Sequence, residues 1–266
     1  GDLSLDAGGS SSHTNLSIPD EKSITIEGDL IHSSGVLVVN KGKLEVQGDY
    51  RIQKPKESGY SFSNSKLVMT QSGAHVLVHG DFVMDSLVSH LNYLTRGVLE
   101  VKGDFTQKST HDSSGTDNFL PFNSHKVLLS GSARQTVVFE DLEITGNSNS
   151  RIGHLEISNS SDNVTLQGPV SISRITSNGH KIKSDNASIT SLTSFNDNLT
   201  ISGNLSLDAG GSSSHTVLSL SNGKSLTIEG NLVHSSGVLN VNNGKLKVQG
   251  DYRIQKPKES GYSFSN

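Results

Sequence analysis

The chain repeats itself, and this repeat constrains its fold more than any other feature of the sequence. At an offset of 202 residues, 52 of the 64 positions in residues 1–64 are identical in residues 203–266. The chain therefore contains one full unit, residues 1–202, and the first third of the next unit, residues 203–266. Repetition on this scale is typical of proteins whose units stack on their neighbours. We expect one continuous rod with no linker between the units.

A shorter motif recurs inside the unit: a glycine, then Asp or Asn, then an apolar residue. Its spacing varies from 20 residues between Gly28 and Gly48 to 37 between the looser versions at Gly131 and Gly168. A solenoid tolerates such variation, because each coil is one structural unit and extra residues loop outward. The motif predicts corner turns at these residues: Gly28, Asp29, Gly48, Asp49, Gly80, Asp81, Gly103, Asp104, Gly230, Asn231, Gly250 and Asp251.

The shortest interval, residues 29–48, divides into three short segments separated by glycine-containing breaks. Within the segments apolar and polar residues alternate, which is typical of β-strands with one buried face. We therefore predict an all-β fold, a β-solenoid (parallel β-helix) with roughly triangular coils of about 20–28 residues, loop insertions and about 7–10 coils per unit. The predicted core includes Leu3, Leu5, Leu30, Leu37, Val39, Leu44, Val46, Phe82, Phe105 and Ile172, and the predicted exposed residues include Thr25, Glu45 and Gln47.

The two copies test this alternation independently, because 12 positions differ between them. Differences at inward positions exchange one apolar residue for another: Ile18 for Leu220 and Ile24 for Leu226. Strand differences that alter polarity or charge fall at outward positions: Asn15 for Val217, Val38 for Asn240 and Glu45 for Lys247. This sorting supports the solenoid.

Composition excludes several other classes of protein. Hydrophobic residues make up 32% of the chain and charged residues 18%, which is too polar for a large compact core and lacks the charge excess of a disordered chain. The net charge of −4, with no basic patch, argues against a nucleic-acid partner. There are no cysteines and no apolar run near the ~18–20 residues of a membrane helix. No signal peptide is recognisable. The first residues already resemble the middle of a strand, so we expect the N-terminus to be internal to a longer protein.

Two segments resemble known bacterial surface proteins. Residues 124–145 (SHKVLLSGSARQTVVFEDLEIT) and residues 97–107 (GVLEVKGDFTQ) resemble a module of large repetitive surface proteins of Gram-positive bacteria. The opening GNLSLDAGG at Gly203 is similar to filamentous-haemagglutinin-type adhesin repeats. The resemblance implies an exported, surface-attached or fibrous bacterial protein, and it supplies no catalytic residues.

The corner acids have two interpretations. Asp2, Asp29, Asp49, Asp81 and Asp104 would stack into a carboxylate ladder that binds Ca²⁺, or their short side chains would bond nearby backbone amides in turns. Calcium requires several converging oxygens, and the corresponding corners at positions 204 and 231 carry Asn instead. Turn chemistry is the favoured interpretation, and no cofactor is expected.

Other candidate sites have weaker support. His75 and His79 lie four apart, which in a strand separates them by ~13 Å, too far to share a metal ion, and His32 has inward parity. Tyr50, Tyr60 and Phe62 form either a core stack, which we favour, or a sugar-stacking patch. Hydrolases and lyases on β-helices need clustered acids. Two groups of acids are available for such a site: Asp6 with Asp29, or Glu140 with Asp141 and Glu143.

The sequence thus predicts a structural rod, stalk or fibre outside the cell or on its surface, and not an enzyme. The rival functions are an adhesin stem that binds a host or sugar ligand, a phage tail-spike β-helix, and a polysaccharide-degrading enzyme. The expected partners are neighbouring units and other copies in a fibre. All sixteen residues from Asp49 to Asn64 recur unchanged; recent duplication, a ligand site, or an inter-unit contact through Lys54, Lys56 and Glu57 would explain this.

Overall fold

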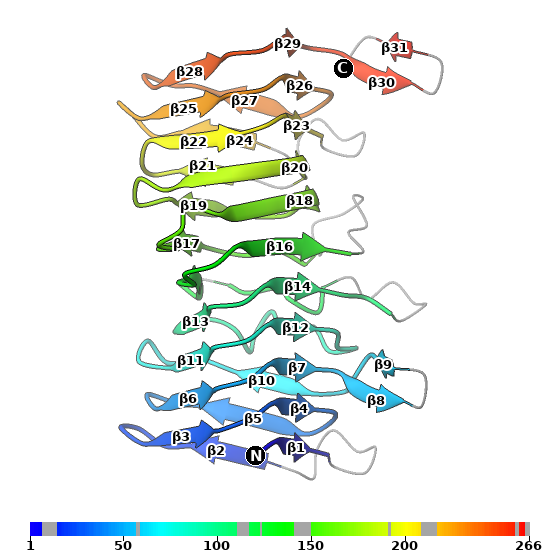
Figure 1. Cartoon of the computed structure of the whole chain (residues 1–266), viewed down its shortest axis with the longest axis vertical. Helices are drawn as coiled ribbons and strands as arrows, with labels where there is room; N and C mark the ends of the chain where they lie inside the picture. The colour runs from blue at the N-terminus through cyan, green and yellow to red at the C-terminus, as the bar shows by residue number, and fades with distance from the viewer. Residues whose placement is uncertain are drawn as a thin grey trace.

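The computed structural model describes residues 1–6, 15–56, 59–110, 117–122, 124–140, 150–190, 193–208, 217–258 and 261–263. These residues form a rod of stacked parallel strands and contain no helix (Figure 1). The prediction of an all-β solenoid is confirmed.

The largest sheet has 14 strands and runs the length of the rod; we call it the first sheet. Its strands are β1 (Leu3–Leu5), β4 (Leu30–His32), β7 (Tyr50–Ile52), β12 (Phe82–Met84), β14 (Phe105–Gln107), β16 (Gln135–Phe139), β18 (Val164–Val170), β20 (Lys181–Ile189), β22 (Leu199–Ser202), β23 (Leu205–Leu207), β25 (Ser225–Ile228), β26 (Leu232–His234), β28 (Lys245–Val248) and β29 (Tyr252–Arg253).

The second sheet has ten strands and the third sheet has three. The second contains β3 (Ser23–Ile26), β6 (Lys43–Val46), β11 (His75–Val78), β13 (Val98–Val101), β15 (Lys126–Leu129), β17 (Leu155–Ile157), β19 (Arg174–Thr176), β21 (Thr193–Phe195), β24 (Val217–Leu220) and β27 (Val238–Asn240). The third contains β2 (Asn15–Ile18), β5 (Val36–Val39) and β10 (Lys66–Val68). Two antiparallel hairpins complete the described strands: β8 (Lys54–Lys56) with β9 (Gly59–Ser61), and β30 (Lys256–Lys258) with β31 (Gly261–Ser263).

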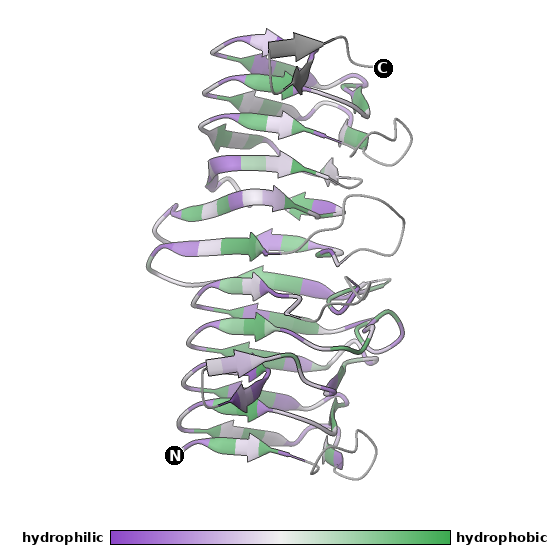
Figure 2. Cartoon of the chain, turned by 90° about the vertical axis from the view of Figure 1, so that its right-hand side faces the viewer, coloured by the Kyte–Doolittle hydropathy of each residue, from purple (hydrophilic) through white to green (hydrophobic). Residues whose placement is uncertain are grey.

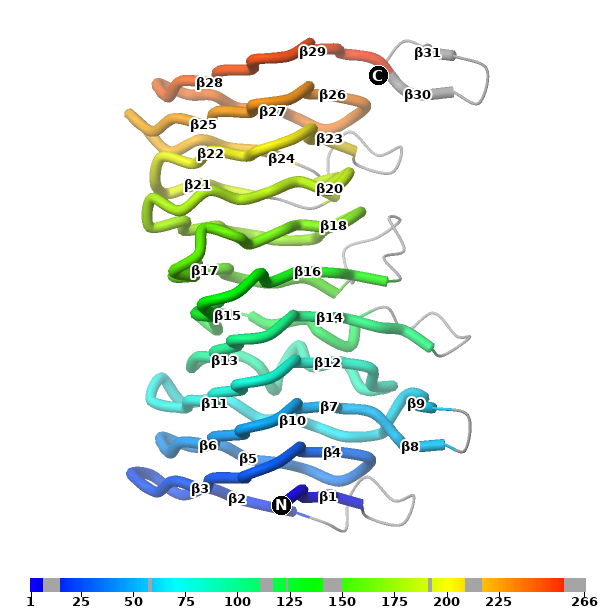
Figure 3. The backbone as a smooth tube through the Cα atoms, in the orientation of Figure 1, coloured from blue at the N-terminus to red at the C-terminus, as the bar shows by residue number. Residues whose placement is uncertain are grey.

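Each N-terminal coil contributes one strand to each sheet. In the coil of β4, β5 and β6, short turns with glycine separate the strands. Figure 1 shows β6 and β7 running in the same direction across the front of the rod, while β5 returns behind them, so the triangle is flattened. Figure 3 traces this path from coil to coil.

The core is a column of apolar side chains inside the coils. Along the strands apolar and polar residues alternate, as the bands of Figure 2 show. Of the ten predicted core residues only Leu3, in the first coil, is half-buried, and its counterpart Leu205 is fully buried beneath neighbours on both sides. Thr25 and Gln47 are exposed as predicted. Glu45 is half-buried, because Lys43 and His79 pack against its carboxylate.

Aromatic rings stack along this core. Tyr50 packs edge-on against Phe82 with ring centroids 5.5 Å apart, and Phe82 stacks on Phe105 at 5.6 Å. Tyr50 is thus a core residue, as the sequence indicated. The prediction is wrong for Tyr60, which is 46% exposed on β9, because the chain leaves the parallel coil at β8 and pairs with itself.

The number of coils per unit falls within the predicted range. Eight pairings separate β1 from its counterpart β23, along the path β1, β4, β7, β12, β14, β16, β18, β20 and β23. At the ~4.8 Å spacing of paired strands, one unit advances the rod by roughly 38 Å.

The two copies pair alike internally but do not join the same columns of strands. In both copies the equivalent strands pair with one another, β2 with β5 and β24 with β27. However, β2 belongs to the third sheet and β24 to the second. The strands of each copy thus pair alike, but between the copies the equivalence is partial, because β1 and β23 share the first sheet whereas β2 and β24 lie in different sheets.

This change of column arises at the long strands β18 and β20. Their register shifts between Gln167 and Pro169, beside Gly168, which has a positive φ of 67°. The first half of β20 pairs with β22 and its second half with β23, so the first sheet becomes two strands wide. A bulge of this kind adds one residue to one strand and displaces everything that follows.

One turn differs between the copies in a way that bears on stability. Glu21, between β2 and β3, has a φ of 59°, whereas the equivalent Gly223 has a φ of 72°. The left-handed region costs a residue with a Cβ roughly 1–2 kcal/mol, whereas glycine enters it without strain. The Glu21 side chain is exposed, so its removal forfeits little packing.

We therefore expect Glu21→Gly to raise the free energy of unfolding by about 0.5–1 kcal/mol, since relief of strain exceeds the greater entropy of unfolded glycine. Urea denaturation measures the change. Gly223→Ala is the matched control and should lower stability by about 1 kcal/mol. Destabilisation by Glu21→Gly would contradict the strain argument.

Candidate functional site

The Gly-Asp corners are joined from coil to coil by a ladder of hydrogen bonds, here called the corner ladder. The backbone N–H of Asp49 donates to Oδ1 of Asp29 (2.8 Å), and that of Asp81 donates to Oδ1 of Asp49 (2.8 Å). The glycines also bond, as Gly48 N–H donates to the carbonyl of Gly28 (3.0 Å). The same N–H to Oδ1 bond joins Asp29 to Asp2, Asp104 to Asp81, Thr136 to Asp104, Asn231 to Asn204 and Asp251 to Asn231 at 2.7–3.0 Å.

Glycine is required in the ladder because the corners approach closely. A Cβ on Gly48 would lie 2.0 Å from Oδ1 of Asp29, and one on Gly28 would lie 2.0 Å from Oδ1 of Asp2. Neither glycine has a positive φ, so the need is for space and not for an unusual backbone conformation. The sequence predicted a turn with local bonds; the structure instead places the bonded amide one coil further along the chain.

Other side chains take over this role where the Gly-Asp motif is absent. After Asp104 the ladder continues through Gln135, whose Nε2 donates to the carbonyls of Val101 (2.9 Å) and Gly103 (2.6 Å). Its Oε1 accepts the amide of Gly131 (2.8 Å) and Nδ2 of Asn159 (2.9 Å).

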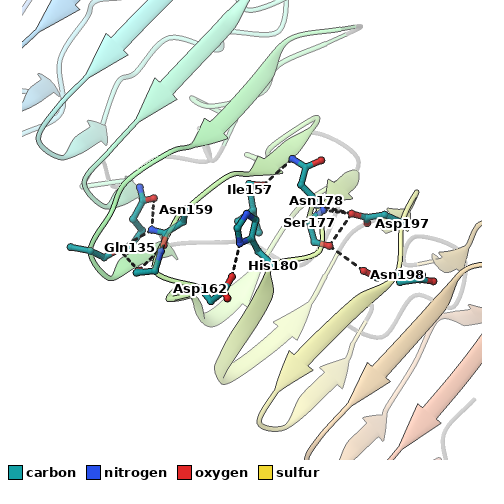
Figure 4. A network of polar contacts seen from close by, with 11 residues as sticks. Gln135, Ile157, Asn159, Asp162, Ser177, Asn178, His180, Asp197 and Asn198 are labelled. Carbon is teal, nitrogen blue, oxygen red and sulfur yellow. Dashed lines mark hydrogen bonds and ion pairs between the residues drawn. The ribbon is translucent and has the colours of Figure 1, made fainter.

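Figure 4 shows this network continuing into the next coils. Oδ2 of Asp197 accepts the backbone N–H of Ser177 (2.7 Å), the Ser177 hydroxyl (2.8 Å) and the N–H of Asn178 (2.7 Å). The sequence did not reveal Gln135, Asn159 or Asp197, because they share no motif and no fixed spacing.

The corner oxygens are largely committed to these bonds. The carbonyls of Asp49 and Gly28 accept Leu30 N–H (2.8 Å) and Gly48 N–H. One carboxylate oxygen accepts an amide in each of Asp2, Asp29, Asp49, Asp81 and Asp104. Calcium binding needs six to eight converging oxygens. Within the described ranges no group of three or more His, Cys, Asp or Glu side chains is arranged to hold a metal ion. The geometry therefore favours hydrogen bonding between coils.

A row of ion pairs covers the outer face of the second sheet. Glu45 accepts Lys43 (2.7 Å) and lies 3.0 Å from Nε2 of His79, and these hydrogen bonds lower the pKa of Glu45 to about 2. In the same sheet His75 lies 3.0 Å from Glu100. The two histidines thus engage different carboxylates. Ion pairs at this exposure contribute about 0–1 kcal/mol each to the free energy of unfolding, and they mainly hold the surface side chains in place.

Three other histidines are buried in the core: His32, His90 and His125. Nδ1 of His32 lies 3.1 Å from the hydroxyl of Tyr50, and Nε2 of His90 accepts the backbone N–H of Leu67 (3.2 Å). Burial lowers the pKa of His32 and His90 to about 4 and that of His125 to about 3. These side chains are therefore neutral at pH 7.

Two shallow hollows lie beside the second sheet. One, of about 290 Å³, is lined by Lys22, Lys41 and Lys43 among others, and the other, of about 280 Å³, by Lys126 and His154. Neighbouring carboxylates offset the lysine charges: Asp20 pairs with Lys41, Glu45 with Lys43 and Glu156 with Lys126. Neither hollow is therefore a strongly charged anion site.

Among the described residues, the candidate catalytic acids do not lie together. Asp6 and Asp29 lie at opposite ends of the paired strands β1 and β4, and Asp6 accepts the Ser34 hydroxyl (2.9 Å). Glu140 pairs with Lys108 (3.0 Å), while positions 141 and 143 lie outside the described residues.

The candidate contact residues lie on a projecting hairpin. Lys54 and Lys56 are exposed on β8, which pairs with β9. Glu57 lies outside the described residues.

In comparisons with known proteins, no family model, no curated protein and no solved structure matches the chain. The described part of the chain contains no helix long and apolar enough to cross a membrane.

The corner ladder predicts different outcomes for two similar substitutions of Asp29. Asp29→Ala removes an amide acceptor and should lower the free energy of unfolding by about 1–2 kcal/mol. Asp29→Asn should change it by less than about 0.5 kcal/mol, because the equivalent Asn231 already makes the bond at 2.7 Å. Thermal and urea denaturation measure both, and equal losses would contradict the ladder.

Gly48→Ala tests the close approach itself. The new methyl group would displace Asp29, so we expect a loss of at least about 2 kcal/mol. Gly153→Ala is the matched control, because the nearest atom to its Cβ is 3.6 Å away. An equally large loss of stability in Gly153→Ala would contradict the argument that Gly48 is required by the close approach of neighbouring corners.

The buried histidines predict destabilisation in mild acid. Their unfolded pKa is about 6.5 and their folded pKa values are near 4 or 3, so between these limits only the unfolded chain takes up protons. The free energy of unfolding should be unaffected above pH ~7 and should fall below pH ~6.5 by up to about 1.4 kcal/mol per pH unit for each histidine. Urea denaturation across this pH range measures the slope.

A double variant tests whether His32 contributes to this dependence of the free energy of unfolding on pH. His32→Leu with Tyr50→Phe removes one buried histidine and its partner, and Leu5 occupies the neighbouring position of the same strand column. The slope should flatten by up to about 1.4 kcal/mol per pH unit. His75→Gln, at the half-buried contact with Glu100 on the outer face, is the control for removing a histidine outside the core. An unchanged slope in the double variant would refute the assignment to His32.

Proposed function

We propose that this chain is a segment of a structural rod, stalk or fibre, built from tandem solenoid units and located on the bacterial cell surface or outside the cell. The observation that carries the proposal is the continuity of bonding along the axis. One sheet runs from β1 to β28, and corner bonds accompany it through every Gly-Asp corner. The location rests on the resemblance of residues 97–107 and 124–145 to repetitive surface proteins.

The exposure of equivalent side chains measures how much each coil depends on the next. Tyr50 is fully buried beneath Phe82, whereas Tyr252, in the last described coil of the rod, is 44% exposed. Likewise Ile52 is fully buried and Ile254 is 58% exposed. Stability in such an array comes from intrinsic unit stability plus contacts between neighbours. Adding units therefore stabilises the array while leaving only two ends uncovered.

Such a rod serves as a spacer of defined length. The first and last described coils lie at opposite ends of the axis (Figure 1), so length grows with the number of units. Because the core is narrow and continuous, adding units does not thicken the rod. This geometry suits a protein that holds another domain away from a surface.

The spacer function predicts a linear relation between units and length. Chains of one, two and three 202-residue units should differ in rod length by roughly 38 Å per unit in electron micrographs or small-angle scattering. A maximum dimension that grows as the cube root of mass, or a broad distribution from flexible joints, would count against a stiff rod. Circular dichroism provides the control for folding.

A further inference from the structure

A face rich in lysine lies on the outside of the first sheet near the C-terminal end of the described rod, and we call it the lysine face. It consists of the outward side chains of β20, β22, β25 and β28, which are neighbours in the sheet (Figure 1), and of the turns before β25 and β28. The strand register places four of these side chains in one outward column: Lys181, Thr200, Thr227 and Lys247. The sequence showed no basic patch, because the lysines of the face come together only when the coils stack: Lys181, Lys183, Lys224, Lys245 and Lys247.

Three of these lysines have no negative partner. Lys224, Lys245 and Lys247 form no ion pair with any described residue. The backbone N–H of Lys245 donates to the carbonyl of Lys224 (2.8 Å), and Lys245 and Lys247 are exposed on the same strand, so the three lie in two adjacent coils. Their charges are therefore available to a negatively charged ligand.

The carboxylates of this face are fewer than its lysines, and two of them are already engaged. Glu229 pairs with Lys181 (2.9 Å), and Asp197, in the turn before β22, accepts N–H groups of the turn before β20. Asp185 lies on β20, two strands away from β25. The face therefore keeps an excess of positive charge on a chain whose net charge is −4.

The first copy has the opposite balance of charge at the equivalent place. From the turns before them to the glycine corners after them, β3 and β6 carry three lysines and four carboxylates, whereas β25 and β28 carry three lysines and one carboxylate. Lys247 makes the largest difference, because it stands where the first copy has the ion-paired Glu45. The two pairs of strands have the same register, so the packing of the coil does not require the excess of lysine.

Hydroxyl and amide groups surround the unpaired lysines. Thr227 lies beside Lys247 in the outward column, and the side chains of Asn222 and Asn243 are exposed in the turns. Such groups donate and accept the hydrogen bonds that sugar hydroxyls make. A lysine ammonium binds a carboxylate through a charge-assisted hydrogen bond. The combination suits a sugar that carries a carboxylate.

Two other classes of anionic partner lack the groups that they need on this face. Single-stranded nucleic acids are held by aromatic rings or arginines on which bases stack, and the described residues of the lysine face include neither. Membrane surfaces are bound by faces that add apolar anchors to lysines. The exposed large apolar residues of the described chain all lie outside the lysine face: Tyr60, Leu91, Phe122, Val238, Tyr252 and Ile254.

We propose that the lysine face binds an acidic polysaccharide, with the carboxylates of the polymer against the three unpaired lysines and its hydroxyl groups against the threonines of the column. Side chains in one column are ~4.8 Å apart, so Lys181 and Lys247 are roughly 14 Å apart along the axis and a linear polymer spans several coils at once. Each contact is weak, and the contacts of one polymer chain add up. This binding is additional to the proposed role as a rod and does not depend on it.

Titration calorimetry with alginate, a polymer of uronic acids, tests the proposal. Lys247→Glu gives the face the residue that the first copy has at this place, so the coil should still fold, and the affinity for alginate should fall roughly tenfold. Lys247→Gln removes the charge without adding another and should weaken binding about threefold. Lys41→Asn is the matched control, because it removes a lysine from the first copy and gives it the residue of the second; the affinity should change less than about twofold.

Salt and competing polymers complete the experiment. Raising NaCl from about 0.05 M to about 0.5 M should weaken alginate binding strongly, and neutral dextran should not bind. Absence of alginate binding at low salt, equal effects of the Lys247 and Lys41 variants, dextran binding as tight as that of alginate, or tighter binding of duplex DNA would overturn the proposal. Circular dichroism checks the fold of each variant. Rod length in electron micrographs separates this outcome from failure of the rod, because an intact rod that binds no alginate contradicts the lysine face alone.

Discussion

The close contact between successive glycine corners sets the geometry of the rod. Because Gly48 has no Cβ, its backbone lies against Gly28, and the Asp29 carboxylate reaches the amide of Asp49. That contact fixes the height of one coil at one side of the chain. Strands that flank the corner must then pair with their neighbours directly above and below. Loops of different length are tolerated elsewhere because they do not enter this contact.

The core was predictable because one physical rule governs it. A strand with one buried face alternates, so Leu44 and Val46 point inward and Glu45 points outward. Tyr60 obeys the same alternation and yet is exposed, since the pattern does not reveal whether a strand pairs with the coil below or with its own chain. Nothing local in KPK or GYS distinguishes these cases. Partner choice is a long-range property.

The candidate site was predictable only in part, for a related reason. The corners at Asp29, Asp49 and Asp81 recur as a motif and are visible in the sequence. Gln135 and Asp197 bond the same kind of backbone group with different side chains and from different positions, so no repeat marks them. The change of strand column at Gly168 depends on how two long strands align, and residues 1–64 alone contain no sign of it.

The presence of both aspartate and asparagine in the corner ladder has a consequence for long arrays. Carboxylates at every ~4.8 Å would form a line of charge about one third as dense as that of duplex DNA, which carries one charge per ~1.7 Å. Such a polyelectrolyte accumulates a counterion atmosphere, and its cohesion depends on the surrounding salt. Asn204 and Asn231 accept the same amide bonds without charge. An array that mixes the two residues can lengthen while its charge per unit length stays moderate, and its cohesion becomes less sensitive to ionic conditions.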